Sequence, residues 1–573
     1  MNSRNNIFGY SNQRSEIRKR TWRVMVLFML LFGFLIWRVA NYMYFNSRIL
    51  KTMFNSQYTI DEKYGSQYSL TDRFGRELLN YEVNYYAIID PVDYLRFNEY
   101  TSKYDLEALT ITLRNYNKNY NLEKIKGTGN GQKLRYKIDK ETYGKLKDIK
   151  KVKGFYTFES NDIIKDRYWK IENILTNTTY NKVSVDTATK NVVSNIVSKS
   201  AGSLEMQIYN KTKNNEYTKV RLTKGVNGEI DTGTIIKPKN NTNVRLTLDK
   251  EIQTKVEDIL KEKAYEKYDQ IGVVLMESSN GKIRAMAQKD DNAYNANLGY
   301  PSTNGALPGS IFKVIVDEAG LDMNLIDNNQ EYKLDHKIFT QEPFKGNTFT
   351  VAQALAKSSN NIFAQLGWKV GIQNIYNYAE KQGILRKVLN LQQEDNGKFQ
   401  GDLLKPSIAE TSQTAIGQNV TITPLEAISI PNTIINNGVY VQPSIIDAYV
   451  DDNNKVLEKT TSKTTTVLKK ETAEAVKLHM MDVVNSKIGT GTEAAIKGMD
   501  IGGKTGTTTY TENKIKKSDG WFVGFFNLNG KNYSMVVFVN NIKMNVDGVA
   551  DEEGGGTAAP IFKEVVNAFK VMD

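Results

Sequence analysis

Cysteine is absent from the chain, and histidine nearly so, with only His336 and His479 among 573 residues. Without cysteine, the protein can form no disulfide framework and no thiolate zinc site, and it cannot use a thiol nucleophile. A Ser-His-Asp triad or a histidine-rich metal centre would have to be built from those two histidines alone. Serine chemistry in this chain therefore needs a base of another type, and we predict no metal ion and no cofactor.

The composition indicates a large globular protein. Apolar residues make up 40% of the chain and charged residues 24%, which argues against wholesale disorder. A chain of 573 residues is too long for one ordinary core, so we expect two or more domains. The formal net charge is +12, but the lysines are spread along the chain and no basic tract dominates. We interpret this charge as a solvated surface and predict no nucleic-acid partner.

A long apolar run lies near the amino terminus. Residues 24–37 (VMVLFMLLFGFLIW) are all apolar, and the run continues past a lone Arg38. A helix needs about 20 such residues to cross the hydrocarbon of a bilayer, so we predict a membrane anchor over residues 22–45. Basic residues precede it, which predicts that residues 1–21 are a cytoplasmic tail and that the rest is extracytoplasmic. A cleaved signal peptide is disfavoured because no small-x-small site follows the run.

The texture of the sequence changes near residue 240, where we place a domain boundary. Residues 46–240 are rich in Tyr, Asn and Lys, with short mixed patterns and no repeat. Within them, SLTDRFGRELLNY (69–81) predicts two strands around a turn at Gly75. Residues 241–573 carry longer periodic elements instead.

The second region reads as strands at its two ends with helices between them. A helix capped by Asp249 is expected to reach about Lys263. Two apolar hairpins, each with an Asn-Gly turn, are predicted over 271–287 and 521–541. A further strand is expected over 499–509, a terminal helix over about 559–571, and mostly helices over 310–487. The distant strands must join to bury their apolar faces, which predicts an α+β fold with one antiparallel sheet flanked by helices and a helical subdomain.

Three short motifs carry candidate chemistry. Ser310 and Lys313 share one face of a predicted helix start, where the helix dipole stabilises negative charge. Alone, this S-x-x-K match is weak, because a chain of this size contains about two by composition. Ser358-Ser359-Asn360 then follows in a polar turn, and Lys504-Thr505-Gly506 follows on a predicted strand. The order and the structural contexts together make the match specific.

These motifs are the signature of penicillin-binding proteins and class A β-lactamases. Residues 241–573 resemble the penicillin-binding transpeptidase domain, and further similar stretches are LTLDKEIQ, AIGQNVTITPLEA, GTGTEAA, GWFVGF and GGGTAAPIFKE. The resemblance implies the fold of serine β-lactamases and transpeptidases. No part of 46–240 looks like a glycosyltransferase, so the chain is most similar to monofunctional class B proteins. By that resemblance, 46–240 is an elongated, mixed α/β non-catalytic domain of the pedestal or dimerisation type.

The resemblance implies a catalytic role for five residues. Ser310 is the nucleophile, and Lys313 is the base that activates it. That lysine must be neutral, which burial and the nearby cation of Lys504 favour. Ser358 relays a proton to the leaving amine, and Asn360 holds the substrate amide.

The strand motif is implied to bind the substrate. Lys504, Thr505 and Thr507 grip its terminal carboxylate, and Gly506 leaves room for a peptide along the strand edge. The backbone N–H groups of Ser310 and Thr507 form the oxyanion hole.

The family acts on peptidoglycan stem peptides ending in D-Ala-D-Ala, through a serine acyl-enzyme that β-lactams also form. The resemblance thus implies a membrane-anchored D,D-transpeptidase, with a carboxypeptidase side activity and cell-wall synthesis partners such as a glycosyltransferase. Two alternatives stay open. A membrane-bound serine β-lactamase is disfavoured because we find no E-x-x-L-N element after the S-x-N triplet. A non-enzymatic penicillin sensor or assembly scaffold could keep all the motif residues.

Overall fold

The computed structural model describes residues 7–44, 59–120, 122, 125, 132–164, 169–185, 192–225, 227–231, 233–299, 305–335, 337–338, 342, 346–512, 515–542 and 554–572. The chain divides into two compact units. Unit 1 comprises Met1–Gly65, Val83–Asp162 and Tyr217–Lys237, and unit 2 comprises Ser66–Glu82, Ile163–Glu216 and Pro238–Asp573. The domain boundary at residue 240 stays a prediction. The two compact units divide the chain differently, because Ser66–Glu82 and Ile163–Glu216 belong to unit 2.

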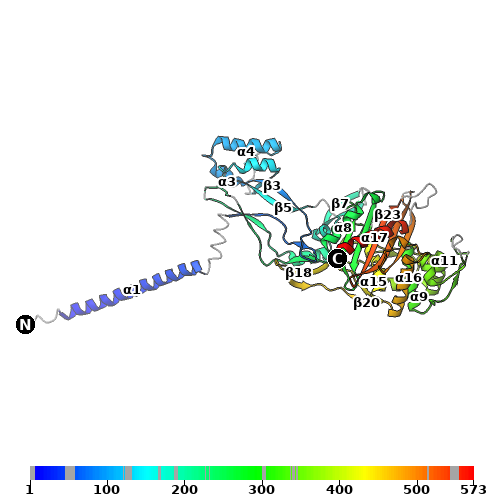
Figure 1. The fold of residues 1–573 in the computed structure, drawn as a ribbon. Coiled ribbons are helices and arrows are strands. Elements are labelled where there is room, and N and C mark those ends of the chain that lie inside the picture. The colour runs from blue at the N-terminus through cyan, green and yellow to red at the C-terminus, as the bar shows by residue number, and fades with distance from the viewer. Residues whose placement is uncertain are drawn as a thin grey trace, which may run out of the picture. The chain divides into compact units, whose positions relative to one another are not determined.

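Helix α1 (Ile7–Tyr44) contains the apolar run (Figure 1). Its segment Glu16–Asn41 is long and apolar enough to cross a membrane, and none of its most apolar window is buried against the rest of the protein. Side chains such as Phe28 and Leu30 are exposed, as a lipid-facing helix requires. The helix extends beyond the predicted span on its amino-terminal side, through the basic residues.

Unit 1 contains two three-stranded sheets, ordered β1-β8-β9 and β4-β3-β5. Their strands are β1 (Thr59–Lys63), β3 (Tyr81–Ile89), β4 (Leu134–Ile138), β5 (Phe155–Ile163), β8 (Lys219–Thr223) and β9 (Thr234–Ile236). Besides α1, its helices include α3 (Pro91–Phe97), α4 (Lys103–Tyr116) and α5 (Lys140–Lys147). Leu109 and Leu113 of α4 share a core with Leu146 of α5 and Ile89 of β3.

The central sheet of unit 2 has five antiparallel strands in the order β12-β11-β23-β22-β21. They are β11 (Gln270–Glu277), β12 (Lys282–Gln288), β21 (Ile501–Glu512), β22 (Ile515–Leu528) and β23 (Lys531–Ile542). Both predicted hairpins are confirmed. At the second turn, Asn529 and Gly530 have φ of 48° and 75°, the left-handed pair that an Asn-Gly turn supplies. The predicted pairing of strands from both ends of the region is also confirmed, through β11 and β23.

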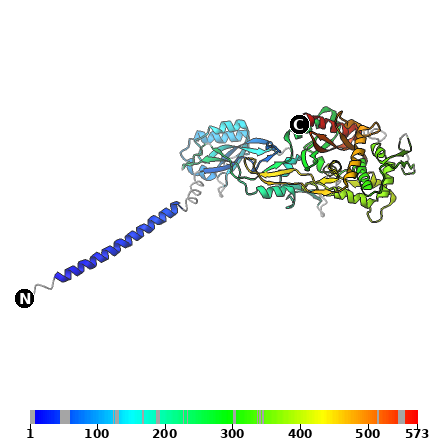
Figure 2. The ribbon, with the colours of Figure 1, turned by 60° about the horizontal axis from the view of Figure 1, so that its bottom comes forward.

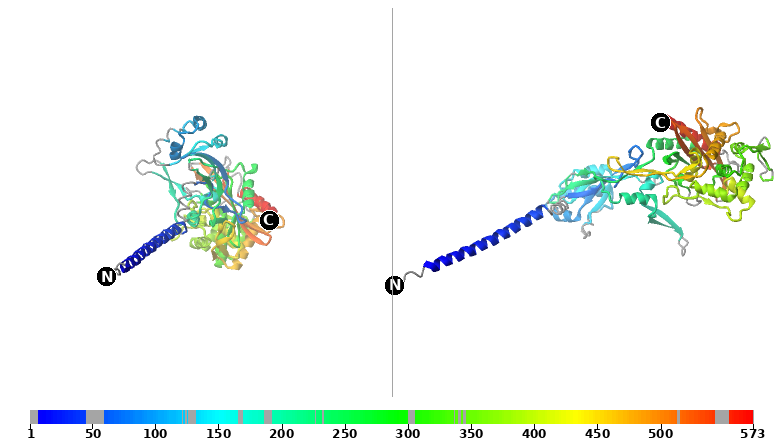
Figure 3. Two further views of the ribbon diagram at one scale, coloured as in Figure 1. Left: turned by 90° about the vertical axis from the view of Figure 1, so that its left-hand side faces the viewer. Right: turned by 90° about the horizontal axis from the view of Figure 1, so that it is seen from below.

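Two helices, α8 (Lys250–Leu260) and α17 (Gly554–Met572), pack on one face of this sheet (Figure 3). Asp249 caps α8 as predicted, because its Oδ1 accepts a hydrogen bond from Glu251 N at 3.2 Å. The helix ends before the expected residue, since η2 (Lys263–Tyr265) is a separate 3-10 turn. Helix α17 begins earlier than expected, at three glycines that are poor helix formers and gave no signal in the sequence.

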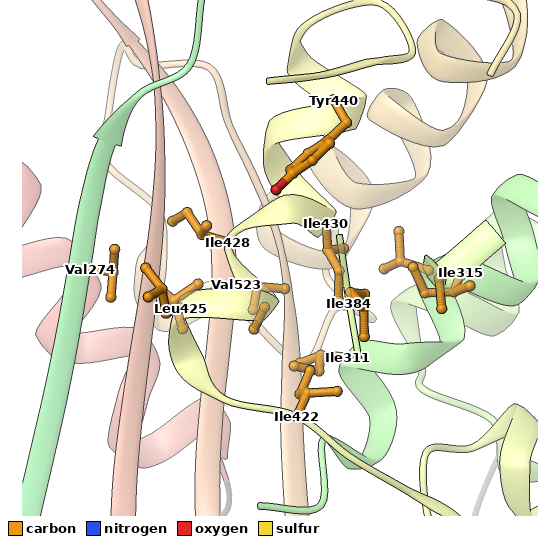
Figure 4. Packing of buried hydrophobic residues seen from close by; sticks show 14 of the residues in the cluster. Val274, Ile311, Ile315, Ile384, Ile422, Leu425, Ile428, Ile430, Tyr440 and Val523 are labelled. Carbon is orange, nitrogen blue, oxygen red and sulfur yellow. The ribbon is translucent and has the colours of Figure 1, made fainter. Parts of the chain in front are cut away.

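The helical subdomain packs beside the other face of the sheet (Figure 2). Its helices are η4 (Gly309–Phe312), α9 (Lys313–Asp322), α10 (Val351–Ala356), α11 (Asn360–Val370), α12 (Ile372–Lys381), α13 (Ile408–Ala415), α14 (Pro424–Ala427), α15 (Ser429–Ile435), α16 (Lys470–Asn485) and η5 (Thr492–Ala494). Ile311, Ile422 and Leu425 meet Val523 of β22 in a common core (Figure 4). This core joins the segment around Ser310 to the sheet.

The stretch predicted to be mostly helical also contains strands. They are β13 (Tyr332–Lys333), β14 (Thr348–Phe349), β15 (Lys398–Phe399), β16 (Val420–Thr421), β17 (Val439–Val441), β18 (Ile446–Val450), β19 (Val456–Lys459) and β20 (Thr464–Thr466). Strand β18 joins a four-stranded sheet, β19-β18-β10-β2, with β10 (Asn243–Leu246) and β2 (Leu70–Thr71). These strands are too short to show a period, and several pair with distant segments. The rest of unit 2 comprises α6 (Ile171–Thr176), β6 (Thr179–Val185), β7 (Val192–Ser198), α7 (Leu204–Thr212) and η3 (Ala296–Leu298).

The segment SLTDRFGRELLNY forms only part of its predicted hairpin. Gly75 has φ of 83°, as a turn requires, but beyond it only an isolated bridge at Glu77 is formed. The Asp72 carboxylate explains this, because it accepts the N–H groups of Phe74 and Arg76, both at 2.9 Å. The Arg76 guanidinium in turn donates a hydrogen bond to Asp249 at 2.9 Å. This bond connects the segment to the residue that caps α8.

A buried ion pair joins two helices of the subdomain. His479 Nδ1 on α16 lies 2.8 Å from Asp317 Oδ2 on α9, and His479 Nε2 lies 2.6 Å from Asn328 Oδ1. Both partners are acceptors, which suits the protonated ring, a donor at both nitrogens. Burial alone would lower the pKa of His479, but the Asp317 carboxylate raises it above its usual value.

We predict that His479→Ala destabilises the protein by about 3 kcal/mol, because it leaves the Asp317 carboxylate buried and unpaired. The raised pKa of His479 contributes to the free energy of unfolding. This contribution is complete below pH 6.5, the usual pKa of histidine, and is lost as the pH rises through the pKa of the folded state. Urea unfolding of the full chain in detergent at several pH values measures this. Leu478→Ala, at the exposed neighbour, is the control. A difference between the two variants that grows above neutral pH would contradict the pairing.

Candidate active site

Ser310 lies in the 3-10 turn η4, which leads directly into α9 at Lys313. The predicted helix start is therefore confirmed. Gly309 has φ of 53°, and its N–H donates to Gly417 O at 3.1 Å, which anchors the turn. Ser310 is partly exposed, whereas Lys313 is completely buried. The candidate nucleophile is thus accessible to solvent, whereas the lysine three residues later is not.

The Lys313 amine contacts the second motif. Its Nζ donates to Ser358 O at 2.6 Å, to Asn360 Oδ1 at 2.7 Å and to Ser358 Oγ at 3.3 Å. Among the hydrogen bonds of the described residues, none joins Lys313 to the Ser310 hydroxyl. The base expected for Ser310 is thus hydrogen-bonded to the S-x-N triplet.

The third motif also contacts the Ser358 hydroxyl. Lys504 on β21 is completely buried, and its Nζ donates to Ser358 Oγ at 2.9 Å and to Thr505 O at 3.0 Å. Ser358 has φ of 59°, which is unfavourable for a residue with a Cβ. The structure therefore brings Lys313 and Lys504 to the hydroxyl of Ser358, a residue in a strained conformation, and brings Lys313 to Asn360 as well.

The surroundings change the charge of Lys313. Burial and the like charge of Lys504 lower the pKa of the Lys313 amine well below its usual value, and Glu342 acts in the opposite direction. A buried amine beside a second cation gives up its proton more easily than one in water. The neutral base that the sequence interpretation required is consistent with this environment.

The strand motif lies on β21, an edge strand of the central sheet. A Cβ on Gly506 would lie 2.7 Å from Pro308 O, so the missing side chain allows β21 to approach η4 closely. The Thr507 hydroxyl accepts a hydrogen bond from Gly554 N, the first residue of α17, at 2.7 Å. The Thr505 hydroxyl lies 2.8 Å from Thr490 Oγ1.

Two residues at the site had been given no role from the sequence. Thr490 lies in GTGTEAA, a stretch noted for similarity only, and it also donates its N–H to Ala356 O at 3.1 Å. Glu342 binds Ser359 Oγ at 2.6 Å, next to the triplet. The sequence around it shows no hydrophobic period and no motif, so it carried no signal for this residue. His336 lies outside the described residues, within which no group of metal-ligating side chains occurs.

Comparisons with known proteins identify a family and relatives for the chain. The family model described as the penicillin binding protein transpeptidase domain matches residues 271–567, more than half of the chain. Stage V sporulation protein D of Bacillus subtilis is 29% identical, covering 57% of this chain and 53% of that protein. Penicillin-binding protein PbpB of Mycolicibacterium smegmatis is 25% identical, covering 57% and 54%. The chain thus spans about half the length of these curated relatives.

Solved structures share the fold. A peptidoglycan synthetase from Bifidobacterium adolescentis aligns with a TM-score of 0.61 at 17% identity, covering 90% of this chain and 96% of that chain. Penicillin binding protein 3 from Mycobacterium tuberculosis aligns with a TM-score of 0.56 at 17% identity, covering 90% and 97%. The chain belongs to the penicillin-binding protein transpeptidase family, and the findings support the class B type within it.

Proposed function

We propose that the chain is a peptidoglycan D,D-transpeptidase that cross-links stem peptides through an acyl-enzyme at Ser310. The observation that carries the proposal is the contact of two buried amines, those of Lys313 and Lys504, with the hydroxyl of Ser358. This arrangement favours a neutral lysine as a base near neutral pH. It supplies what serine chemistry needs in a chain that has almost no histidine.

Acylation begins when Ser310 Oγ attacks the carbonyl carbon of the penultimate D-Ala of a stem peptide. Lys313, on the same helical face, takes the hydroxyl proton. The N–H groups of Ser310 and Thr507 stabilise the oxyanion, an effect typically worth about 3 kcal/mol per donor. The peptide bond then breaks, and the leaving amine of the last D-Ala receives the proton by way of Ser358.

Deacylation runs the same steps in reverse with a new amine. An amine of a neighbouring stem peptide attacks the ester carbonyl, and a peptide bond forms as the ester bond to Ser310 Oγ breaks. The proton that the amine loses returns to Ser310 Oγ through Lys313. Water in place of the amine gives a D-Ala carboxypeptidase side reaction. A β-lactam opens its ring on the same serine, and we propose that it forms a long-lived ester there.

The donor peptide is proposed to lie along the free edge of β21. Asn360 holds its amide, and Lys504, Thr505 and Thr507 bind its terminal carboxylate. Gly506 supports this arrangement because it lets the strand lie close to the turn that carries the nucleophile.

We further propose that α1 anchors the protein in the cell membrane with both units outside. Residues 46–240 then form a non-catalytic domain that positions the catalytic domain, residues 241–573. Cell-wall synthesis proteins such as a glycosyltransferase are the partners that this role implies. The exposed apolar surface of Glu16–Asn41 supports the anchor.

We predict that Ser310→Ala abolishes D-Ala release from a pentapeptide donor and labelling by a fluorescent penicillin, because no other hydroxyl occupies its position. Both are measured on the full chain in detergent, and Ser486→Ala, at the end of α16, is the control. Persistent labelling of the Ser310 variant would place the nucleophile elsewhere. Wild type that is labelled but releases no D-Ala would be a sensor or scaffold. Nitrocefin turnover without a stable adduct would mark a β-lactamase.

We predict that Lys504→Met moves the acid limb of the acylation rate to higher pH, by about one unit. Without the neighbouring positive charge, Lys313 keeps its proton to a higher pH and is inactive as a base there. The rate constant for penicillin acylation, measured from pH 5 to pH 10, gives the limb. Lys516→Met removes an exposed charge on β22 as the control. An unmoved or lower limb in the Lys504 variant would reject this account of the base.

A further inference from the structure

Glu342 binds both residues that flank Asn360. Its Oε2 accepts from Ser359 Oγ at 2.6 Å, and its Oε1 accepts from Asn361 N at 2.9 Å. Ser359 is completely buried and also caps α11, where its hydroxyl accepts the N–H of Ile362 at 3.2 Å. One carboxylate thus forms hydrogen bonds with the residues before and after Asn360, whose side-chain amide contacts Lys313.

The turn held by this carboxylate needs external support. Ser358, at its start, has φ of 59°, a conformation that a residue with a Cβ keeps only when its surroundings impose it. Its neighbour Ser359 donates its N–H to Ala354 O at 2.9 Å, which fixes one side of the turn. The bonds to Glu342 come from a separate segment, between β13 and β14, and restrain the other side.

We propose that Glu342 is a positioning residue of this site, whose carboxylate holds the turn that carries Ser358 and Asn360. The inference rests on the proposed function, because it assigns Glu342 to the same acylation reaction. The carboxylate does not touch the reacting atoms. It acts through the two side chains that bind the base.

The charge of Glu342 gives it a second effect on the base. Lys504 from β21 lowers the pKa of Lys313, whereas Glu342 raises it. Asp317, one turn along α9, pairs with His479 instead. Burial has the largest effect on the pKa of Lys313, and among the described residues Lys504 and Glu342 are the charged groups that shift it further.

A carboxylate that only caps a helix would make the hydrogen bonds but would not affect the pKa of Lys313. Glu410 provides the comparison, because its carboxylate accepts the N–H and the hydroxyl of Ser407, both at 2.8 Å, at the exposed start of α13. Both acids lie at a helix start, where negative charge is favourable. Only Glu342 also acts on Lys313, so an effect on the pH dependence separates a positioning role from a structural one.

The test compares Glu342→Gln, Glu342→Asp and the control Glu410→Gln in the full chain in detergent. The rate constant for acylation by a fluorescent penicillin is measured from pH 5 to pH 10. Glu342→Gln is expected to lower the plateau roughly tenfold, since a misplacement of about 1 Å costs up to ~100-fold. It also shifts the acid limb to lower pH by about one unit, because Lys313 loses a neighbouring negative charge.

The aspartate variant keeps the negative charge but shortens the side chain, so it separates the effect of the charge from that of the hydrogen bonds. Glu342→Asp is expected to keep the acid limb and to lower the plateau, and Glu410→Gln to change neither. A Glu342→Gln profile that coincides with wild type within twofold, with the same acid limb, overturns the proposal. Should the glutamine variant fail to fold, an unchanged plateau in Glu342→Asp overturns it, and a lowered plateau with an unmoved limb supports it.

A second readout does not depend on turnover. In protein that contains lysine labelled with 13C at Cε, the NMR chemical shift of Lys313 Cε, assigned by its loss in Lys313→Arg and followed across the same pH range, reports when the amine is neutral. Glu342→Gln is expected to move this titration to lower pH by the same amount. If wild type is never acylated by penicillin, the proposed function fails, and a shifted titration would still support the role of Glu342. An unshifted titration overturns that role on its own.

Discussion

The site depends on one hydroxyl shared by two buried amines. Lys313 and Lys504 both donate to Ser358 Oγ, and neither side chain is exposed to solvent. Two positive charges held so close in a medium of low dielectric repel each other strongly, so the proton on one of them is easily lost. The packing of the central sheet against the helical subdomain brings these three side chains together.

The central sheet and the helical subdomain supply the two halves of this arrangement. Lys504 comes from β21, at the edge of the sheet, and Lys313 comes from the first residue of α9. The packing of Ile311 and Ile422 against Val523 joins the subdomain to the sheet, and Gly506 lets the two halves approach closely. A change in this packing would separate the amines, although none of the packing residues has a polar group.

Local signals in the sequence predicted much of the fold but little of its long-range pairing. The Asn-Gly turns predicted both hairpins, and Asp249 predicted the start of α8, because each of these depends on a few adjacent residues. Strands such as β18 and β2 were missed or overextended, since their partners lie far away in the chain. Glu342 was missed for the same reason, because its partners Ser359 and Asn361 lie 17 and 19 residues further along the chain.

The sequence by itself determined which chemical groups are present: a serine with a lysine three residues on, and almost no histidine to compete as a base. It also determined the turns and caps, which depend on neighbouring residues only. The tertiary structure decided that Lys313 contacts Ser358 and Asn360, and that burial and Lys504 lower its pKa. The physical reason is that desolvation and Coulomb interactions depend on which distant segments meet, and no local pattern of residues specifies this.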